Sequence, residues 1–132
     1  MASNTSPLEH DEQVVVVQWL ELHEIKFTST PNSTFTKSWN QKRKNYAEGL
    51  RPGWPDLNIL IRPDQSFDGI GHLLLLEMKR VKGGVVSSDQ RGWIAALNGL
   101  NSVNIDSVVA HGADEAIEYL AQIVNTTFNN PF

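Results

Sequence analysis

No cysteine occurs among the 132 residues of this chain, and that absence removes several kinds of chemistry. Disulfide frameworks, thiolate zinc sites and a cysteine nucleophile are all excluded. Long apolar runs are also missing, because runs such as residues 14–17 and 73–76 are far shorter than the roughly 20 residues that a membrane span needs. Since no Lys or Arg precedes Lys26, the first residues do not resemble a signal peptide. We therefore expect a cytoplasmic protein.

Positive charge is scarce overall, with 11 Lys and Arg against 15 Asp and Glu and a formal net charge of −4. Such a balance alone argues against a nucleic-acid partner, because phosphates repel an acidic surface. All the basic residues lie between Lys26 and Arg91, however, and this segment has a net charge of +5 while the segments before and after it have −5 and −4. This segregation is typical of a protein with one basic face, although a solvated surface also shows it by chance.

Length and composition are those of one globular domain, so residues 1–132 are expected to fold as a single unit. Cap residues and helical spacing predict helices at residues 7–23, 40–48, from 88 onward and at 113–124. Strands are predicted at residues 25–30, 57–61, 72–80 and 105–110, with a connecting loop at 62–71 and a loose tail at 125–132. The order of these elements predicts a compact mixed α/β layer structure.

The first helix is the least obvious of these elements. Its four consecutive valines at 14–17 would equally suit a buried strand. Ser6 followed by Pro7 is a helix start signal, and Glu9 would close a capping box with Ser6. Helical spacing also joins Val14, Val17 and Leu20. These signals favour the helix.

Three charged side chains stand at the ends of apolar strands. Asp56 precedes the strand at 57–61, while Glu77 and Lys79 lie near the end of the strand at 72–80 and share one face of it. If the two strands are antiparallel neighbours, Asp56 lies beside Glu77. Two carboxylates that leave water positions open suit Mg²⁺, which acidifies a bound water and neutralises phosphate charge. Lys79 would orient that water or help to deprotonate it.

A simpler interpretation of each residue stands beside this one. Taken singly, Glu77 and Lys79 are typical of a surface ion pair, and Asp56 is typical of a turn. Their placement favours function instead, because the run at 73–76 indicates a strand buried on both faces. Charges there are costly unless they are paired or bound to a metal.

These residues resemble a known pattern. Pro55-Asp56 followed by Glu77-Met78-Lys79 resembles the PD-(D/E)xK nuclease signature. The surrounding residues are similar to those of the VRR-NUC family of virus-type replication and repair nucleases, over nearly the whole chain and in particular to stand-alone members that are typically phage-encoded. The residues that carry this similarity are Gly53-Trp54-Pro55-Asp56-Leu57, Glu77-Met78-Lys79-Arg80, Gly83-Gly84, Ser87, Gln90 and Trp93. One departure is residues 33–35, where many relatives are glycine-rich.

The resemblance implies a restriction-endonuclease-like core, in which helices flank a central mixed four-stranded sheet. It also implies that Asp56, Glu77 and the backbone carbonyl of Met78 bind a metal ion, Mg²⁺ or in its place Mn²⁺, and that Lys79 is the catalytic lysine. Gln90 would support the site or contact phosphate, and it also fits a capping box with Ser87.

Glu9 matches the glutamate that completes the acidic cluster of the family, both as a metal ligand and in catalysis. The capping box with Ser6 is an alternative role for Glu9, and Glu12 is then the substitute for it in the cluster.

Basic residues and aromatic rings alternate in the middle of the chain. Such a pattern suits phosphate contacts and base stacking, although an exposed helix face with a few core aromatics would also produce it. The expected DNA-binding residues are Lys37, Lys42, Arg43, Lys44, Arg51, Arg80 and Lys82, interleaved with Trp39, Tyr46 and Trp54. The four histidines, His10, His23, His72 and His111, have no metal-ligand spacing and are expected to be structural.

The sequence thus predicts a metal-dependent DNA endonuclease that hydrolyses phosphodiester bonds with water. Family resemblance implies selectivity for branched DNA, such as four-way junctions or flaps. A homodimer is expected, because one site cuts one strand and symmetric cleavage needs two. Two alternatives stay open: a nuclease-fold module that binds nucleic acid or a partner without cutting, and a metal-dependent hydrolase of small phosphate esters. The second would leave the net charge of +5 in the middle segment without a purpose.

Overall fold

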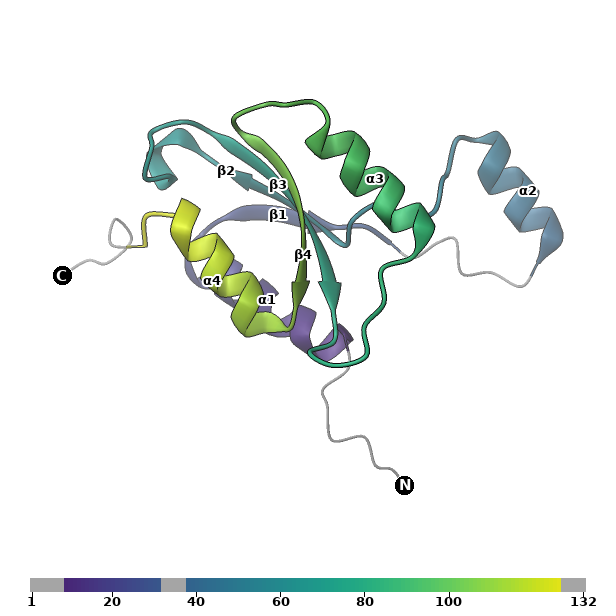
Figure 1. Cartoon of the computed structure of the whole chain (residues 1–132), viewed down its shortest axis with the longest axis horizontal. Coiled ribbons are helices and arrows are strands. Elements are labelled where there is room, and N and C mark those ends of the chain that lie inside the picture. Colours follow the sequence, from purple (N-terminus) through teal and green to yellow (C-terminus); the bar gives the residue numbers. More distant parts are fainter. Residues whose placement is uncertain (1–8, 32–37, 127–132) are drawn as a thin grey trace, which may run out of the picture.

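A computed structural model describes residues 9–31 and 38–126 of the chain (Figure 1). The elements agree with those expected from the sequence to within two residues where both ends are described, apart from one short 3₁₀ helix inside the expected loop. They are α1 (Glu9–Leu22), β1 (Lys26–Ser29), α2 (Trp39–Ala47), β2 (Leu57–Ile61), η1 (Pro63–Gln65), β3 (His72–Lys79), α3 (Ser88–Asn98), β4 (Ile105–His111) and α4 (Ala113–Ile123). None of the helices in the described residues is long and apolar enough to cross a membrane.

The four strands form one mixed sheet in the order β1-β2-β3-β4. β1 pairs with β2 and β2 with β3 in antiparallel fashion, whereas β3 and β4 are parallel. A parallel pair needs a long crossover, and α3 supplies it. The expected α/β fold with a central mixed four-stranded sheet is confirmed.

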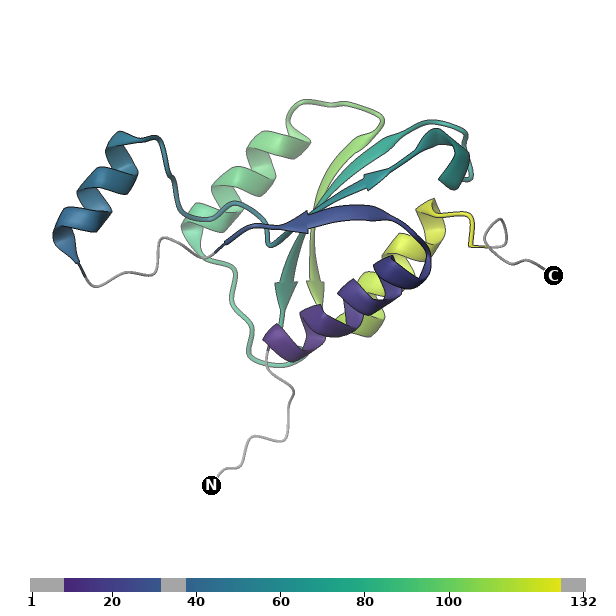
Figure 2. The same cartoon turned by 180° about the vertical axis from the view of Figure 1, so that it is seen from behind.

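Helices cover both faces of the sheet (Figures 1 and 2). α1 and α4 lie side by side on one face, and α3 lies on the other. β3 is therefore buried on both sides, with every residue from 74 to 79 buried. Leu74, Leu76 and Met78 point into the core beneath α1 and α4, so Glu77 and Lys79 must point to the opposite face. The expectation that charged groups sit in a buried strand is confirmed.

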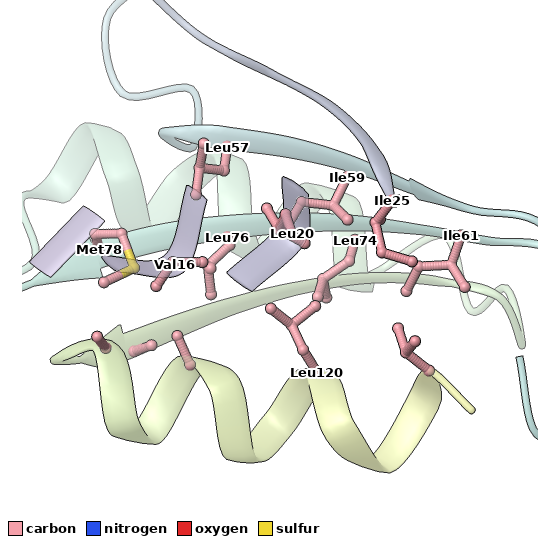
Figure 3. Packing of buried hydrophobic residues seen from close by; sticks show 14 residues of the cluster. Val16, Leu20, Ile25, Leu57, Ile59, Ile61, Leu74, Leu76, Met78 and Leu120 are labelled. Carbon is pink, nitrogen blue, oxygen red and sulfur yellow. The ribbon is translucent and has the colours of Figure 1, made fainter. Parts of the chain in front are cut away.

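The main core is built from apolar side chains of the sheet and of the two helices below it (Figure 3). α1 contributes Val16 and Leu20, which are one helical turn apart and fully buried. The valine run therefore belongs to a helix, as expected. Val14, which the sequence spacing joined to Val17 and Leu20, does not share their burial, because it is 40% exposed.

The sequence makes two predictions for the ends of the chain, a helix start at Ser6 and Pro7 and a loose tail from residue 125. The helix start at Ser6 and Pro7 lies outside the described residues. The loose tail is expected at residues 125–132, but Asn125 is held in place, because its N–H donates to the Gln65 carbonyl over 2.7 Å. Val124 also forms a β-bridge with Ser66, so this part of the chain is held against the loop after β2. Residues 127–132 of the expected tail lie outside the described residues.

We expect Leu76→Ala to lower the free energy of unfolding by about 3 kcal/mol, because Leu76 is completely buried between the sheet and its helices. Leu22→Ala is the matched control, since Leu22 is 75% exposed and should change stability by less than about 0.5 kcal/mol. Urea unfolding followed by circular dichroism measures both. Equal losses in the two variants would contradict this packing.

Candidate active site

The antiparallel pairing of β2 with β3 brings the two predicted carboxylates together. Leu57 pairs with Leu76, so Asp56, one residue before β2, lies opposite Glu77. Asp56 Oδ2 accepts a hydrogen bond of 2.8 Å from the backbone N–H of Met78. Its own carbonyl accepts one from Thr30 N–H, also at 2.8 Å. Thr30, the residue after β1, thus fixes the backbone of Asp56, and β3 fixes its side chain.

Glu77 is the most buried charged side chain of the site, with 2% of the residue exposed. Burial, followed by the neighbouring charge of Asp56 and a hydrogen bond to it, raises the pKa of Glu77 to about 8, although Lys79 opposes the shift. Without a metal ion, Glu77 therefore carries a proton at neutral pH and shares it with Asp56. A divalent cation bound there would take the place of that proton.

Lys79 lies between two acidic residues from different elements. Its Nζ is 3.7 Å from Glu77 Oε2 and 3.7 Å from Glu9 Oε1. The Lys79 residue is only 6% exposed, so its ammonium depends on these carboxylates for charge compensation. This arrangement sets the positive group directly beside the carboxyl pair.

Gln90 performs both of the roles that the sequence left open. Its Oε1 accepts a 2.8 Å hydrogen bond from Ser87 N–H, while Ser87 Oγ accepts one of 3.1 Å from Gln90 N–H, which completes a capping box at the start of α3. The amide nitrogen Nε2 then donates to Glu77 Oε2 over 2.8 Å. The helix cap fixes the side chain that in turn positions the Glu77 carboxylate.

The choice between Glu9 and Glu12 follows from the geometry. Glu9 reaches Lys79, as described above, whereas Glu12 Oε1 accepts a 2.6 Å hydrogen bond from Ala113 N–H at the start of α4. Glu12 thereby caps a helix instead of joining the acidic group. The alternative pairing of Glu9 with Ser6 lies outside the described residues.

A cleft of about 460 Å³ opens beside the carboxyl pair, and Asp56, Gln90 and Arg51 line it. Trp54 lines this cleft and packs against Trp93. The sequence identifies both tryptophans in the family motif and Trp54 also in the expected DNA-binding pattern. Trp54 and Trp93 pack edge to face with ring centroids 5.1 Å apart. They are further anchored because Trp54 Nε1 donates to Asn58 Oδ1 and Trp93 Nε1 to Pro52 O.

Gly53 explains why the turn before Asp56 can lie so close to α3. Its φ of +98° is strained for other residues, and a Cβ there would come within 2.7 Å of the Asp89 carbonyl carbon. The glycine therefore allows the turn to contact the first turn of α3, which also carries Gln90. Backbone proximity of this kind gives no periodic signal in the sequence.

A second, more polar cleft of about 450 Å³ is lined by Lys79. Glu9, His10, Arg80 and Gly84 also line it. A Cβ on Gly84 would come within 2.8 Å of the Lys79 Cβ, so this glycine lets the loop after β3 pass over the lysine. His10, expected to be structural, lies at this cleft instead of in the core.

The remaining histidines make contacts that stabilise the fold. His72 Nε2 is 3.0 Å from Asp68 Oδ2, and His111 Nδ1 is 3.1 Å from Arg80 O. The ring of His23 lies 4.3 Å from that of Trp19, measured between centroids.

The expected DNA-binding residues fall on three regions. Arg51 borders the first cleft, Arg80 borders the second, and Lys82 is exposed in the loop beyond it. α2 carries Lys42, Arg43 and Lys44, all exposed. Lys37 lies outside the described residues. Trp54 is packed against α3, whereas the other two aromatics of the predicted pattern, Trp39 and Tyr46, are exposed on α2.

The donor set at Asp56 and Glu77 fits Mg²⁺ better than an ion that needs an all-protein cage. Mg²⁺ binds through one or two carboxylates and keeps several waters. Over residues 9–31 and 38–126, no group of three or more His, Asp or Glu side chains is arranged to hold a metal ion, so a zinc-type site has no basis there. The Met78 N–H donates to Asp56 Oδ2, whereas metal binding by the Met78 carbonyl stays a prediction.

A mixed β-sheet with this strand order and flanking helices, with Asp56 just before β2 and with Glu77 and Lys79 on β3, is the framework of a nuclease-fold domain. The chain belongs to the VRR-NUC domain family, whose model matches residues 3–114.

The comparison with solved structures supports the same assignment. A protein described as a VRR_NUC domain protein has a TM-score of 0.65 and 23% sequence identity to this chain, over 92% of this chain and 89% of that one. The family expected from the sequence is therefore confirmed. No match is found among curated proteins.

The raised pKa of Glu77 predicts how stability depends on pH. Its pKa is about 8 in the folded chain and about 4.5 when unfolded, so between these values the folded state binds the extra proton. The unfolding free energy of the metal-free protein should therefore decrease as pH rises through this window. Glu77→Gln has no titrating group at this position, so its unfolding free energy should not show this decrease. The difference in unfolding free energy between the variant and wild type should therefore shift in favour of the variant by a few kcal/mol as pH rises through the window, since one pKa unit corresponds to about 1.4 kcal/mol.

Urea unfolding in EDTA at a series of pH values measures this difference. Glu118→Gln is the matched control, because Glu118 is exposed on α4 and should follow the wild-type curve. A Glu77→Gln curve that runs parallel to wild type would show that the carboxyl is already ionised in the folded protein.

Proposed function

We propose that this protein is a metal-dependent endonuclease that hydrolyses phosphodiester bonds in DNA. The observation that supports it most directly is the buried carboxyl pair of Asp56 and Glu77 with Lys79 beside it, at the border of two polar clefts. Membership in a nuclease family adds to this argument.

The acidic residues hold the metal ion in this proposal. Asp56 and Glu77 bind Mg²⁺, or Mn²⁺ in its place, together with the backbone carbonyl of Met78, and Glu9 completes the acidic group. When bound, the ion supplies a Lewis acid that lowers the pKa of a water molecule and neutralises phosphate charge. Gln90 keeps the Glu77 carboxylate in one orientation through its hydrogen bond to Oε2.

Lys79 provides the positive charge closest to the reacting phosphate. Its Nζ lies 3.7 Å from both Glu77 Oε2 and Glu9 Oε1, which are ion-pair distances longer than hydrogen bonds. In this proposal the N–H donors of the ammonium orient the attacking water or stabilise the charge that develops on a phosphoryl oxygen. The water oxygen attacks phosphorus and forms the new P–O bond, and that water gives up a proton. The bond from phosphorus to the leaving oxygen breaks, and the leaving oxygen takes up a proton.

The basic segment of the chain suits a DNA substrate better than a small phosphate ester. Contacts with several phosphates require cations beyond the reaction centre. Arg51 and Arg80 lie at the two clefts beside the carboxyl pair. Further cations for such contacts are Lys37, Lys42, Arg43, Lys44 and Lys82.

The family supports branched DNA, such as four-way junctions or flaps, as the preferred substrate. One site cuts one strand, so symmetric cleavage of a junction needs two copies, and a two-fold homodimer supplies them most simply. Such DNA arises during replication and repair, which puts the proposed activity in the cytoplasm of a bacterial or phage-infected cell. Light scattering after gel filtration tests the dimer.

We expect Asp56→Asn and Lys79→Ala to reduce cleavage of labelled junction, flap and linear DNA by at least about 100-fold, in the range seen when one charge-stabilising group is removed from an active site. Cleavage should require Mg²⁺ or Mn²⁺ and stop in EDTA. Lys79→Ala should still bind Mg²⁺ in a calorimetric titration, because both carboxylates remain. Asp64→Asn is the control, since Asp64 is exposed on η1 and pairs with Arg62.

The results separate the proposal from its alternatives. Binding without cutting under every metal condition would indicate a non-cleaving module. Turnover of a small phosphate diester together with DNA affinity that does not fall with salt would indicate a small-molecule hydrolase, because several phosphate contacts produce a steep salt dependence. Wild-type cleavage by either variant would mean that the site lies elsewhere.

A further inference from the structure

The helix α2 contributes nothing to the core. It has no buried residue, and Figures 1 and 2 show it projecting away from the sheet and from the other three α-helices. Two of its largest side chains are exposed, Trp39 at 73% and Tyr46 at 63%. Exposed aromatic area of this size on one short helix is typical of a surface that meets a partner.

The aromatic and basic residues of α2 share one face. Residues three, four and seven positions apart lie together on a helix, which groups Trp39 with Lys42, Arg43 and Tyr46. Lys42 Nζ lies 5.1 Å from the centre of the Trp39 ring. The helical period puts Lys44 on the opposite face, so the same helix has a basic residue outside this group.

Arg51 connects this face to the candidate active site. Its guanidinium lies 3.7 Å from the centre of the Tyr46 ring, and Nη1 donates a 2.8 Å hydrogen bond to Tyr46 O. Arg51 also lines the cleft that contains Asp56 and Gln90. A single line of rings and positive charges thus leads from the carboxyl pair to the end of α2.

Exposed cation–π pairs contribute only about 0.5–1 kcal/mol each, so they do not by themselves explain two large rings held in solvent. Rings and cations on one path are what a strand of unpaired nucleic acid requires, because each base offers a flat face and each nucleotide a phosphate. In a paired duplex the base faces are stacked inside the helix, so cations that contact phosphates would be sufficient to bind it.

We propose that the face formed by Trp39, Lys42, Tyr46 and Arg51, here called the α2 face, binds the unpaired DNA strand next to the cleavage site. Trp39 and Tyr46 stack on bases, while Lys42 and Arg51 contact phosphates. The inference rests on the proposed function, because it assigns the α2 face to the substrate of the same site. A second copy of the chain fits this face less well, since a two-fold contact would set its cations against each other.

The test measures equilibrium binding in EDTA, where no cleavage occurs. The probes are a labelled single strand of about 15 nucleotides, within the size range that single-strand sites cover, and a blunt duplex of the same sequence. Trp39→Leu should weaken binding of the single strand by about 10-fold, as expected for the loss of one stacked base, and binding of the duplex by less than about 2-fold. Trp39→Phe should retain most of the single-strand affinity.

A matched pair of lysine variants separates the α2 face from charge in general. Lys42→Ala and Lys44→Ala remove the same charge from the same exposed helix, and the first should weaken single-strand binding more than the second. Circular dichroism and thermal melting should be unchanged in all these variants, because none of these side chains is buried.

Three results would overturn the proposal. Equal losses for single strand and duplex would show a general phosphate contact. Equal effects of the two lysine variants would show that the face is not used. Single-strand binding that survives Trp39→Leu while a dimer becomes a monomer in light scattering would show that α2 joins two copies of the chain.

The binding test of the α2 face can succeed even when the proposed catalytic site is wrong. A selective loss of single-strand binding supports the α2 face even when Lys79→Ala leaves cleavage unchanged, and in that case the assignment of the catalytic site fails alone.

Discussion

The antiparallel register of β2 and β3 is the constraint on which the rest of the site depends. It sets Asp56 opposite Glu77 inside a protein layer that excludes water from most of the Glu77 carboxyl. Burial, followed by the repulsion between the two ionised acids, raises the pKa of Glu77 and leaves a shared proton between them. In the proposed function, a divalent cation bound by the pair would remove both the repulsion and the cost of burial.

The other elements compensate for this concentration of charge. Lys79 and Gln90 each contact the Glu77 carboxylate, the first from β3 itself and the second from the start of α3. α3 is positioned by Gly53 and by the edge-to-face packing of Trp54 on Trp93. A helix cap, a close backbone approach and an aromatic pair thus act together on one carboxylate, so changes well away from Glu77 are able to disturb it.

Much of this arrangement could be predicted because its signals are local. Alternation along a strand puts Glu77 and Lys79 on one face, and the capping box of Ser87 with Gln90 follows from their spacing. Other features depend on contacts between distant segments. Glu9 and Glu12 lie on the same helix turn with the same chemistry, and only the approach of α4 to Glu12 separates their roles.

The sequence by itself determined the order of elements and the nuclease family, since these depend on residue types and on spacing within single helices and strands. The tertiary structure decided which acid reaches Lys79, that one Gln90 side chain serves both the cap and the carboxylate, and that α2 stands clear of the core with its rings exposed. Those outcomes depend on how separate elements pack, and packing energies arise between residues that no local pattern connects.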